Sequence, residues 1–434
     1  MNYQQCLSYL DHIQALGIKF GLDNVRAVVE KLNNPHQDFP IIQVAGSNGK
    51  GSVCAMVTRI LSLHQIKCGL FTSPHLVEAE ERIRIGNELI PRDRFCRLLS
   101  LLKEVIQQLI KEKTLKTPPT YFELMTLLAL LYFRKEQVDM AVLEVGMGGR
   151  FDATTVVNPD VTAITTISNE HQEYLGDSLS QIALEKAGII KPGIPVVSGV
   201  ENDEARKAIK QKAESLKAPF IEVFGKDSCF ERTKTKNGYV LEYAFNGETY
   251  RYSPSLPGLH QGKNGATAIR IADQISRAGR KLEKETIIKG LETTEWEGRL
   301  EVVSRRPLII MDGAHNMEGA LALREYWSEF VGHLSVLIFA VMRDKQIKEL
   351  SGVLFPLAEQ IILTRFPFRR SASPEDVLAQ SMAFKHKIIC VSEPEQALQS
   401  ALRSVEEKGS ILIAGSLYIV GAMKKYLKAR ANQS

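Results

Sequence analysis

Short apolar runs alternate with longer stretches of helical period along the N-terminal half of the chain. The runs are rich in Val, Ile, Leu and Phe and lie at 39–46, 67–73, 138–146, 160–168 and 194–199. Two of the stretches between them, 50–64 and 120–137, place apolar residues at helical spacing. Strands that alternate with helices indicate a mainly parallel sheet covered on both faces. The pattern predicts an α/β fold whose ligands bind at the carboxyl ends of the strands.

The pattern changes near residue 228 and again near residue 300. Two alternating runs surround Asn246-Gly247 within 228–252, which predicts a small β insertion with a hairpin. A second α/β series follows, with apolar runs at 308–316, 334–341, 359–366, 387–392 and 410–416. We therefore expect two domains, 1–296 and 297–434.

Composition narrows the class of protein. The 434 residues carry 55 basic and 50 acidic side chains, a net charge of +5 that is spread along the chain. This balance does not indicate a nucleic-acid partner. The six cysteines have no C-x-x-C spacing, and no apolar run has the length of a membrane span. We expect a cytoplasmic, monomeric protein with small-molecule substrates and no membrane partner.

A glycine-rich loop follows the first predicted strand, in the sequence "VAGSNGKGS". Gly46, Gly49 and Gly51 allow backbone N–H groups to turn inward, and Lys50 adds a positive charge at the start of a helix. This context predicts a phosphate-binding loop. The usual hydroxyl residue directly after the lysine is replaced by Gly51, so Ser52 comes one position late and leaves open which residues hold the metal.

Several polar side chains follow later strands and could complete that site. Ser73 and His171 come just past predicted strands, Glu144 lies at the end of another, and Lys186 lies on a short predicted helix. A hydroxyl, a carboxylate and an imidazole could together hold Mg²⁺, although hard cations prefer oxygen. The alternatives are structural: Ser73 shapes a turn, Glu144 pairs with Arg150, His171 begins a helix, and Lys186 is a solvated helix lysine.

Nine motifs in order connect these pieces between residues 46 and 421. They are "GSNGKGS", "FTSPHL", "ERIRI", "EVGMGGRFDAT", "LGDSLSQIALEKAGIIKPG", "GLHQGKNGATA", "WEGRLEVV", "DGAHN" and "GSLYIVG". Together they resemble the folylpolyglutamate synthase/dihydrofolate synthase family, within the Mur ligase superfamily. The resemblance implies an N-terminal P-loop ATPase-like domain and a C-terminal Rossmann-like domain. It also implies a ligase that joins L-glutamate to dihydropteroate or (tetrahydro)folate polyglutamates with ATP as co-substrate.

The resemblance also assigns roles to residues. Those that match ATP-binding positions are Gly46, Ser47, Asn48, Gly49, Lys50, Gly51, Ser52, Asn264, Arg299 and Asp312. The metal-binding positions, for two Mg²⁺ ions, are Ser73, Glu144, His171 and Lys186, the last as a carbamate. The pterin-binding positions are Leu22, Asp23, Asn24, Thr120, Tyr121, Phe122, Glu123, Phe151, Asp152 and Ala153. His315 and Ser416 match positions near the incoming glutamate, and Lys50, Lys186 and His315 are the expected catalytic residues.

One departure from the family pattern lies beside the expected metal site: Glu170 replaces the usual Asp before His171 and adds a methylene. Two other functions remain as alternatives. One is a Mur-type ligase for cell-wall precursors, which "TYFE", "GGRFDAT" and "HQGKN" disfavour. The other is a nucleotide-gated switch that hydrolyses ATP without an acceptor.

Overall fold

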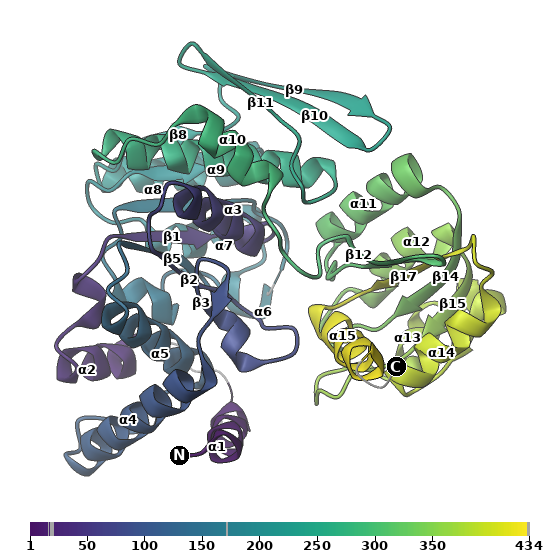
Figure 1. The fold of residues 1–434 in the computed structure, drawn as a ribbon, viewed down its shortest axis with the longest axis horizontal. Coiled ribbons are helices and arrows are strands. Elements are labelled where there is room, and N and C mark those ends of the chain that lie inside the picture. The colour runs from purple at the N-terminus through teal and green to yellow at the C-terminus, as the bar shows by residue number, and fades with distance from the viewer. Residues whose placement is uncertain (16, 18–20, 171, 432–434) are drawn as a thin grey trace.

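Two separate sheets organise the chain into two lobes (Figure 1). The computed structural model describes residues 1–15, 17, 21–170 and 172–431. Every strand of the larger sheet comes from residues 41–222, and every strand of the smaller one from residues 301–414. The predicted α/β class with two sheet domains is confirmed. We keep the proposed boundary at 296/297, which lies between these two groups of strands.

The larger sheet has eight strands. In the spatial order given next, the strands from β2 to the far edge at β8 run parallel to one another. In spatial order they are β4 (Glu88–Leu89), β3 (Ile83–Ile85), β2 (Cys68–Phe71), β5 (Met140–Glu144), β1 (Ile41–Ala45), β6 (Val161–Ile164), β7 (Val196–Ser198) and β8 (Phe220–Glu222). The apolar runs between 39 and 199 are confirmed as strands. The pattern missed β3, β4 and β8, which have two or three residues each and lie at the edges of the sheet.

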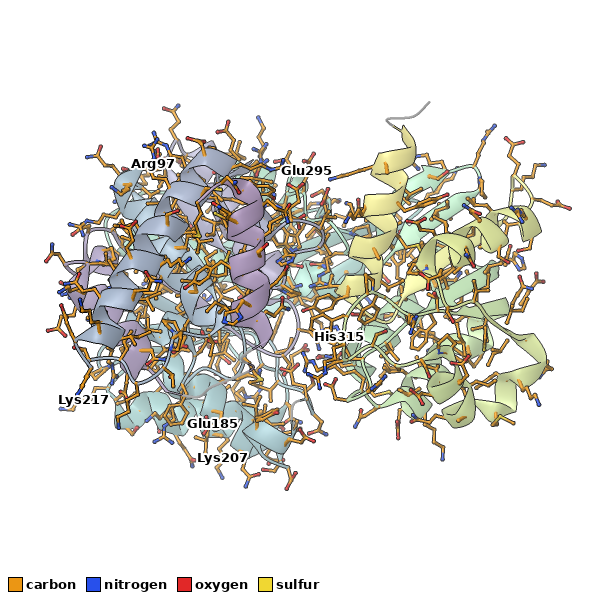
Figure 2. All side chains as sticks on the ribbon, turned by 90° about the horizontal axis from the view of Figure 1, so that it is seen from below. Arg97, Glu185, Lys207, Lys217, Glu295 and His315 are labelled. Carbon is orange, nitrogen blue, oxygen red and sulfur yellow. The ribbon has the colours of Figure 1, made fainter. Side chains whose placement is uncertain are left out.

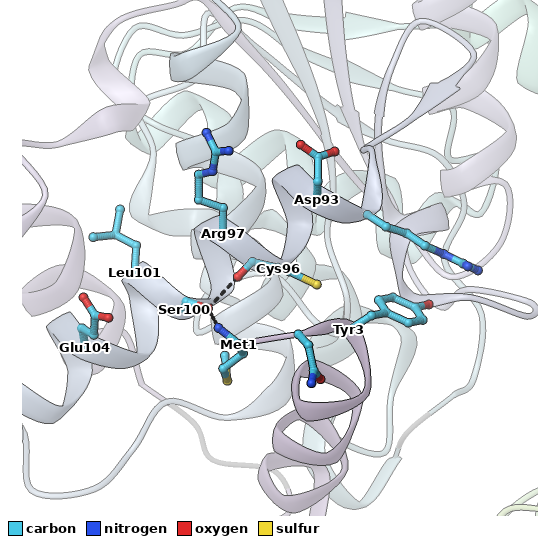
Figure 3. Close-up of a pocket in the computed structure, with 10 residues that line it drawn as sticks. Met1, Tyr3, Asp93, Cys96, Arg97, Ser100, Leu101 and Glu104 are labelled. Carbon is cyan, nitrogen blue, oxygen red and sulfur yellow. Dashed lines mark hydrogen bonds between the residues drawn. The ribbon is translucent and has the colours of Figure 1, made fainter.

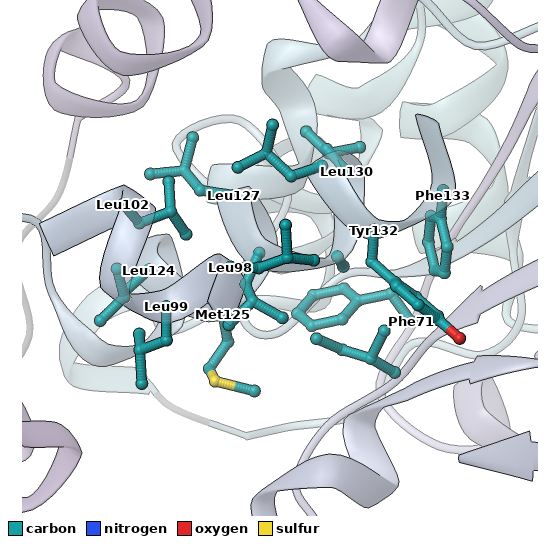
Figure 4. Close-up of a cluster of buried hydrophobic side chains, with 14 of the residues drawn as sticks. Phe71, Leu98, Leu99, Leu102, Leu124, Met125, Leu127, Leu130, Tyr132 and Phe133 are labelled. Carbon is teal, nitrogen blue, oxygen red and sulfur yellow. The ribbon is translucent and has the colours of Figure 1, made fainter. Parts of the chain in front are cut away.

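Helices cover both faces of this sheet. They are α1 (Tyr3–Ala15), α2 (Asp23–Lys31), α3 (Lys50–Leu63), α4 (Arg92–Lys111), α5 (Tyr121–Lys135), α6 (Gln172–Leu175), α7 (Leu179–Lys186), α8 (Asp203–Ser215), α9 (Leu259–Arg277) and α10 (Lys284–Glu292). Alternate strand residues face opposite sides, so Leu143 packs with α4 and α5 while Val142 packs with α3 and α9. Figure 4 shows the first of these cores, where leucines of α4 and α5 surround Phe71.

The predicted β insertion is a three-stranded antiparallel sheet formed by β9 (Ser228–Thr235), β10 (Gly238–Phe245) and β11 (Glu248–Tyr252). Asn246 and Gly247 both have positive φ and join β10 to β11, as a tight hairpin requires. The hairpin is therefore confirmed. Its outer side contacts the second lobe, where the Tyr239 ring packs edge-on against Phe330 with 5.1 Å between centroids.

The second lobe repeats the layered arrangement around a six-stranded sheet. Its strands in spatial order are β12 (Glu301–Arg305), β13 (Leu308–Met311), β17 (Ser410–Ala414), β14 (Leu334–Phe339), β15 (Ala358–Leu363) and β16 (Ile388–Cys390), parallel except for β12. Its helices are α11 (Met317–Tyr326), α12 (Ile347–Leu354), α13 (Pro374–Gln380), α14 (Pro394–Ser404) and α15 (Leu417–Ala431). A π-helical turn, Trp327–Val331, extends α11.

From the composition we expect neither a disulfide framework nor a membrane span, and both expectations can be compared with the structure. All six cysteines are free thiols, four of them buried, so the chain has no disulfide framework. In the described parts of the chain, no helix combines the length and the apolar content needed to cross a bilayer.

Candidate active site

The carboxyl ends of both sheets open into one cavity of about 1670 Å³. Residues that directly follow strands line it from both lobes: Ser47, Ser73, Thr165, Asp312, Met342 and Ser416. His315, also in its lining, lies where the two lobes meet (Figure 2). The sheet topology therefore brings to one place side chains that are far apart in sequence, as expected for parallel α/β sheets.

The glycine-rich loop forms one wall of the cavity and joins β1 to α3. Gly49 is the N-cap of α3 with φ 84°, and an added Cβ there would lie 2.3 Å from Asn264 Oδ1. Lys50 Nζ donates to the carbonyl oxygens of Gly46 at 2.8 Å and Ser47 at 3.1 Å. An ammonium has three N–H donors, so one remains for a phosphate oxygen. The loop, the free donor and the helix N-terminus suit an anionic phosphate chain.

Ser52 supplies a hydroxyl one turn behind the loop. The residue lines the cavity and is buried, and its Oγ has no hydrogen-bond partner within the described residues. A buried hydroxyl without a partner costs free energy, so a ligand that occupies it compensates that cost. Ser52, one position later than the usual P-loop hydroxyl, is thus available to a metal ion or a phosphate oxygen.

We expect Ser52→Ala to lower activity without lowering stability. The substitution removes a hydroxyl that no protein group satisfies, so the free energy of unfolding should stay unchanged or rise by up to about 1 kcal/mol. Loss of the contact between this hydroxyl and a metal ion or phosphate oxygen should reduce turnover at limiting Mg²⁺ by about tenfold or more. Denaturant unfolding and Mg²⁺-dependent kinetics measure the two effects. A destabilised variant with parental Mg²⁺ dependence would contradict this role.

Glu144 and Ser73 form an oxygen-rich corner beside the loop. Glu144 Oε2 accepts the Ser73 backbone N–H at 2.9 Å. Burial raises the pKa of Glu144, while the positive charge of Lys50 and the Ser73 N–H oppose the rise. The alternative pairing of Glu144 with an arginine on its own loop does not occur, because the Arg150 guanidinium lies over the Phe151 ring at 5.0 Å.

This corner fits a hard divalent cation by its donor chemistry. Ser73 and Glu144 offer oxygens, and the partnerless Ser52 Oγ is on the same cavity wall. Within the described ranges, no group of three His, Cys, Asp or Glu side chains could hold a metal by itself. His171, the remaining predicted ligand, lies outside the described residues.

Lys186 ends α7 in the buried floor of the site. Its Nζ donates to the Gly46 carbonyl at 3.0 Å and to Glu170 Oε1 at 2.7 Å. Burial lowers the pKa of Lys186, and the Glu170 carboxylate opposes that change. The alternative of a solvated helix lysine is therefore wrong, since the side chain is only 2% exposed. Glu170, the residue that departs from the family pattern, is the ion-pair partner.

Most of the residues predicted to bind the pterin line the cavity near α5. Several of them also make hydrogen bonds that stabilise the local fold. Tyr121, Phe122, Phe151 and Ala153 line it, and the Phe151 side chain is 46% exposed. Thr120 and Glu123 line it too, but they also form the capping box of α5.

Asp152 lines the same wall, and its carboxylate organises the loop after β5. It accepts N–H groups of Gly146 at 2.9 Å, Met147 at 3.1 Å and Thr154 at 3.0 Å. These bonds leave Asp152 suited to positioning the wall rather than to binding a ligand directly.

The predicted N-terminal contribution to the pterin site stays a prediction. Leu22, Asp23 and Asn24 are not among the lining residues. They begin α2, whose helical period turns Asn24 inward on the same face as Val28. Among the described residues, the N-terminal ones that line the cavity come earlier: Asp11, Gln14, Gly17 and Gly21.

The predicted residues of the second lobe meet the cavity from its other side. Arg299 lines it, and the Asp312 carboxylate accepts the Leu300 and Ala314 N–H groups, each at 2.8 Å. His315 Nδ1 lies 2.8 Å from the Gly313 carbonyl, so Nδ1 carries the proton and Nε2 keeps its lone pair. Burial, aided by Lys345, lowers the pKa of His315 to about 4. Ser416 is buried and also lines the cavity.

A direct contact between the lobes was not foreseen from the sequence. Asn48 of the loop accepts from Asn316 Nδ2 at 2.9 Å and donates to Glu318 Oε2 at 2.5 Å. Asn316 is the N-cap of α11, so the phosphate loop bonds the start of that helix. Other lining residues that the sequence pattern missed are Arg82, Lys345, Phe368, Arg369, Arg370 and Tyr418.

A smaller pocket of about 610 Å³ lies elsewhere, between the start of the chain and α4 (Figure 3). The Met1 amino group donates to Ser100 Oγ at 2.7 Å on its floor. None of the residues predicted to bind substrate lines this pocket.

Comparison with known proteins identifies the family. The Mur ligase middle domain model matches residues 44–272, and the Mur ligase, glutamate ligase domain model matches residues 298–417. The dihydrofolate synthase/folylpolyglutamate synthase of Bacillus subtilis (strain 168) is 32% identical over 432 residues, 98% of this chain and 99% of the relative. The chain belongs to the dihydrofolate synthase/folylpolyglutamate synthase family.

Other members of this family agree over the full length. The folylpolyglutamate synthase of Lacticaseibacillus casei is 30% identical and covers 98% of this chain and 99% of its own length. A bifunctional folylpolyglutamate synthase/dihydrofolate synthase solved with Mn, AMPPNP and L-glutamate superimposes with TM-score 0.86, 27% identity and coverage of 99% and 98%. The predicted Mur ligase architecture and ATP-dependent ligase class are confirmed, and they hold over the cell-wall ligase and ATPase-switch alternatives.

Proposed function

We propose that this enzyme joins the amine of L-glutamate to the carboxylate of dihydropteroate and of folate polyglutamates, with ATP as co-substrate. One observation carries the proposal. The phosphate loop, the Glu144 corner and the His315–Ser416 wall face one cavity that both lobes form. Such a cavity can hold a triphosphate, a carboxylate acceptor and an amine together.

The chemistry explains why these groups must meet. A carboxylate does not react with an amine at neutral pH, because oxide would have to leave. Attack of a carboxylate oxygen on the γ-phosphorus releases ADP and leaves an acyl phosphate, whose leaving group is phosphate. Lys50 lies where it can bind the transferred phosphoryl oxygens, and the loop N–H groups hold the phosphate chain.

The second step uses the opposite wall. The glutamate amine attacks the acyl carbon, phosphate leaves, and the amine loses a proton. Burial keeps the His315 ring neutral by lowering its pKa to about 4, and Nε2 carries the lone pair because Nδ1 donates to the Gly313 carbonyl. We assign His315 the role of proton acceptor and Ser416 a contact with the incoming glutamate. The Asn48–Asn316 bond joins the two walls, and a closed arrangement of the lobes would keep water from the acyl phosphate.

Magnesium completes the proposed site. Ser73 and Glu144, with His171, would hold one ion, and Lys186 as a carbamate would help hold a second. Bound Mg²⁺ would neutralise the phosphate charge during phosphoryl transfer. Support for Lys186 is its position, since Nζ reaches the Gly46 carbonyl of the phosphate loop. A carbamate there replaces the Lys186–Glu170 ion pair of the free amine.

We expect Lys186→Ala to lose most activity and small carboxylic acids to restore part of it. The acid would occupy the position of the carbamate oxygens and supply the missing negative charge. Turnover measured against acetate concentration tests this, with Lys207→Ala as the control for an exposed helix lysine. An intact-mass spectrum of the parent, taken without acid, tests the modification itself. A bare amine in a fully active, bicarbonate-replete enzyme would contradict the carbamate.

The acceptor assay tests the function as a whole. Purified enzyme receives ATP, Mg²⁺ and L-glutamate with dihydropteroate or with tetrahydrofolate, and products are identified by mass. We expect one added glutamyl unit with dihydropteroate and successive additions with tetrahydrofolate. Absence of product with both acceptors would refute the proposed function. Product with one acceptor alone would restrict the enzyme to that reaction.

A further inference from the structure

Two arginines on the second lobe line the cavity and have no assigned role. Arg369 and Arg370 follow β15 in the sequence "FPFRRS", and both are exposed at the cavity rim. Their neighbours Arg365 and Arg343 pair with Glu393 and Asp376. By contrast, no carboxylate among the described residues pairs with the guanidinium of Arg369 or Arg370. The Arg370 guanidinium lies over the Phe368 ring, 5.6 Å from its centroid. Two adjacent guanidinium groups without a carboxylate partner among the described residues, beside a substrate cavity, favour an anionic ligand.

The backbone that carries these arginines is firmly held. The Arg370 carbonyl accepts the Arg343 N–H at 2.9 Å, and the buried Ser371 hydroxyl accepts the Phe366 N–H at 3.2 Å. The Phe368 ring stacks on Tyr418 with 4.8 Å between centroids. The arginine pair is therefore a built feature of the cavity wall rather than the tip of a loose loop.

Positions for two other parts of the reaction are already proposed elsewhere in the cavity. The triphosphate suits the Lys50 loop on the first lobe, and the incoming glutamate is proposed for the buried His315–Ser416 wall. Arg369 and Arg370 line the same cavity but, unlike the buried Ser416, are exposed to solvent. The remaining anionic groups are the α-carboxylates along an acceptor that already bears glutamyl units. Each round adds one such carboxylate, and a lengthening chain must extend towards solvent while its reacting end stays at the phosphates.

We propose that Arg369 and Arg370 form a carboxylate subsite for the γ-glutamyl tail of the acceptor. The inference rests on the proposed ligase function and extends it to the choice of acceptor length. A guanidinium binds a carboxylate through two parallel N–H donors, so the pair can hold two successive α-carboxylates. The Phe368–Tyr418 stack gives the tail an apolar surface beside them.

The test compares acceptors that differ only in tail length. The double variant Arg369→Gln/Arg370→Gln and the parent are assayed with dihydropteroate and with mono- and triglutamyl tetrahydrofolate. We expect the ratio of variant to parent KM to grow with tail length, reaching about tenfold or more for the triglutamate. KM values for ATP and free glutamate should not follow this trend. Equilibrium binding of the triglutamate, measured without turnover, should weaken to a similar degree.

Two controls make the outcomes distinct. Arg365→Gln removes a nearby exposed arginine that does not line the cavity, and it should leave the length dependence as in the parent. Arg369→Lys/Arg370→Lys should restore part of the affinity. An equal KM increase for every acceptor, or an increase for free glutamate alone, would overturn the tail subsite. A parent that ligates dihydropteroate but no tailed acceptor would also overturn it, while the ligase function would stand.

Discussion

Lys50→Ala should abolish ligation in a protein that remains folded. Lys50 Nζ is the cation of the phosphate loop, and among the described residues it bonds two carbonyls of its own loop. Its removal therefore takes away transition-state charge stabilisation without opening the core. We expect kcat to fall by about 10²–10³-fold or more. Steady-state kinetics measure the loss, and the melting temperature shows whether the fold persists.

A matched variant separates the loop from general charge effects. Lys207→Ala removes the same charge from an exposed position on α8 and should behave as the parent (Figure 2). A folded Lys50→Ala enzyme with near-parental turnover would refute the phosphate-loop assignment.

Glu144→Gln should raise the Mg²⁺ concentration needed for half-maximal activity by at least about 10- to 100-fold. Glutamine keeps the shape and still accepts the Ser73 N–H, but it lacks the negative charge that binds a divalent cation. The buried position of Glu144 makes this charge costly unless a cation compensates it. Activity titrated with Mg²⁺ measures the shift.

Glu295→Gln provides the comparison for this variant, since it removes an exposed carboxylate that does not line the cavity. Its Mg²⁺ titration should match that of the parent. Superimposable titration curves for Glu144→Gln and the parent would remove Glu144 from the proposed ligands.

The fold could be predicted where local sequence dictates local structure. Asn246-Gly247 specifies a hairpin by backbone conformation alone, and the buried parallel strands appear as continuous apolar runs. The edge strands β3, β4 and β8 are too short to give a period and owe their structure to pairing with neighbours.

In the candidate site too, local sequence predicts some residues and not others. Ser73 and Glu144 could be located because they lie just past or at the end of a strand, and the carboxyl ends of parallel strands share one edge. Asp312 is predicted only from the family resemblance. The Asn48–Asn316 contact and the Arg369–Arg370 pair depend on how the two lobes meet, which no local pattern contains. Thr120 and Glu123 have the spacing of a capping box and form one at the start of α5, while their contact with a pterin stays a prediction.

The most direct test of the central claim follows one oxygen atom. Acceptor labelled with oxygen-18 in its reacting carboxylate is incubated with enzyme, ATP, Mg²⁺ and L-glutamate, and the released phosphate is analysed by mass. An acyl-phosphate ligase transfers one labelled oxygen to phosphate in each turnover and releases little phosphate without acceptor. Unlabelled phosphate, released at the same rate with or without acceptor, would contradict the account and indicate simple ATP hydrolysis.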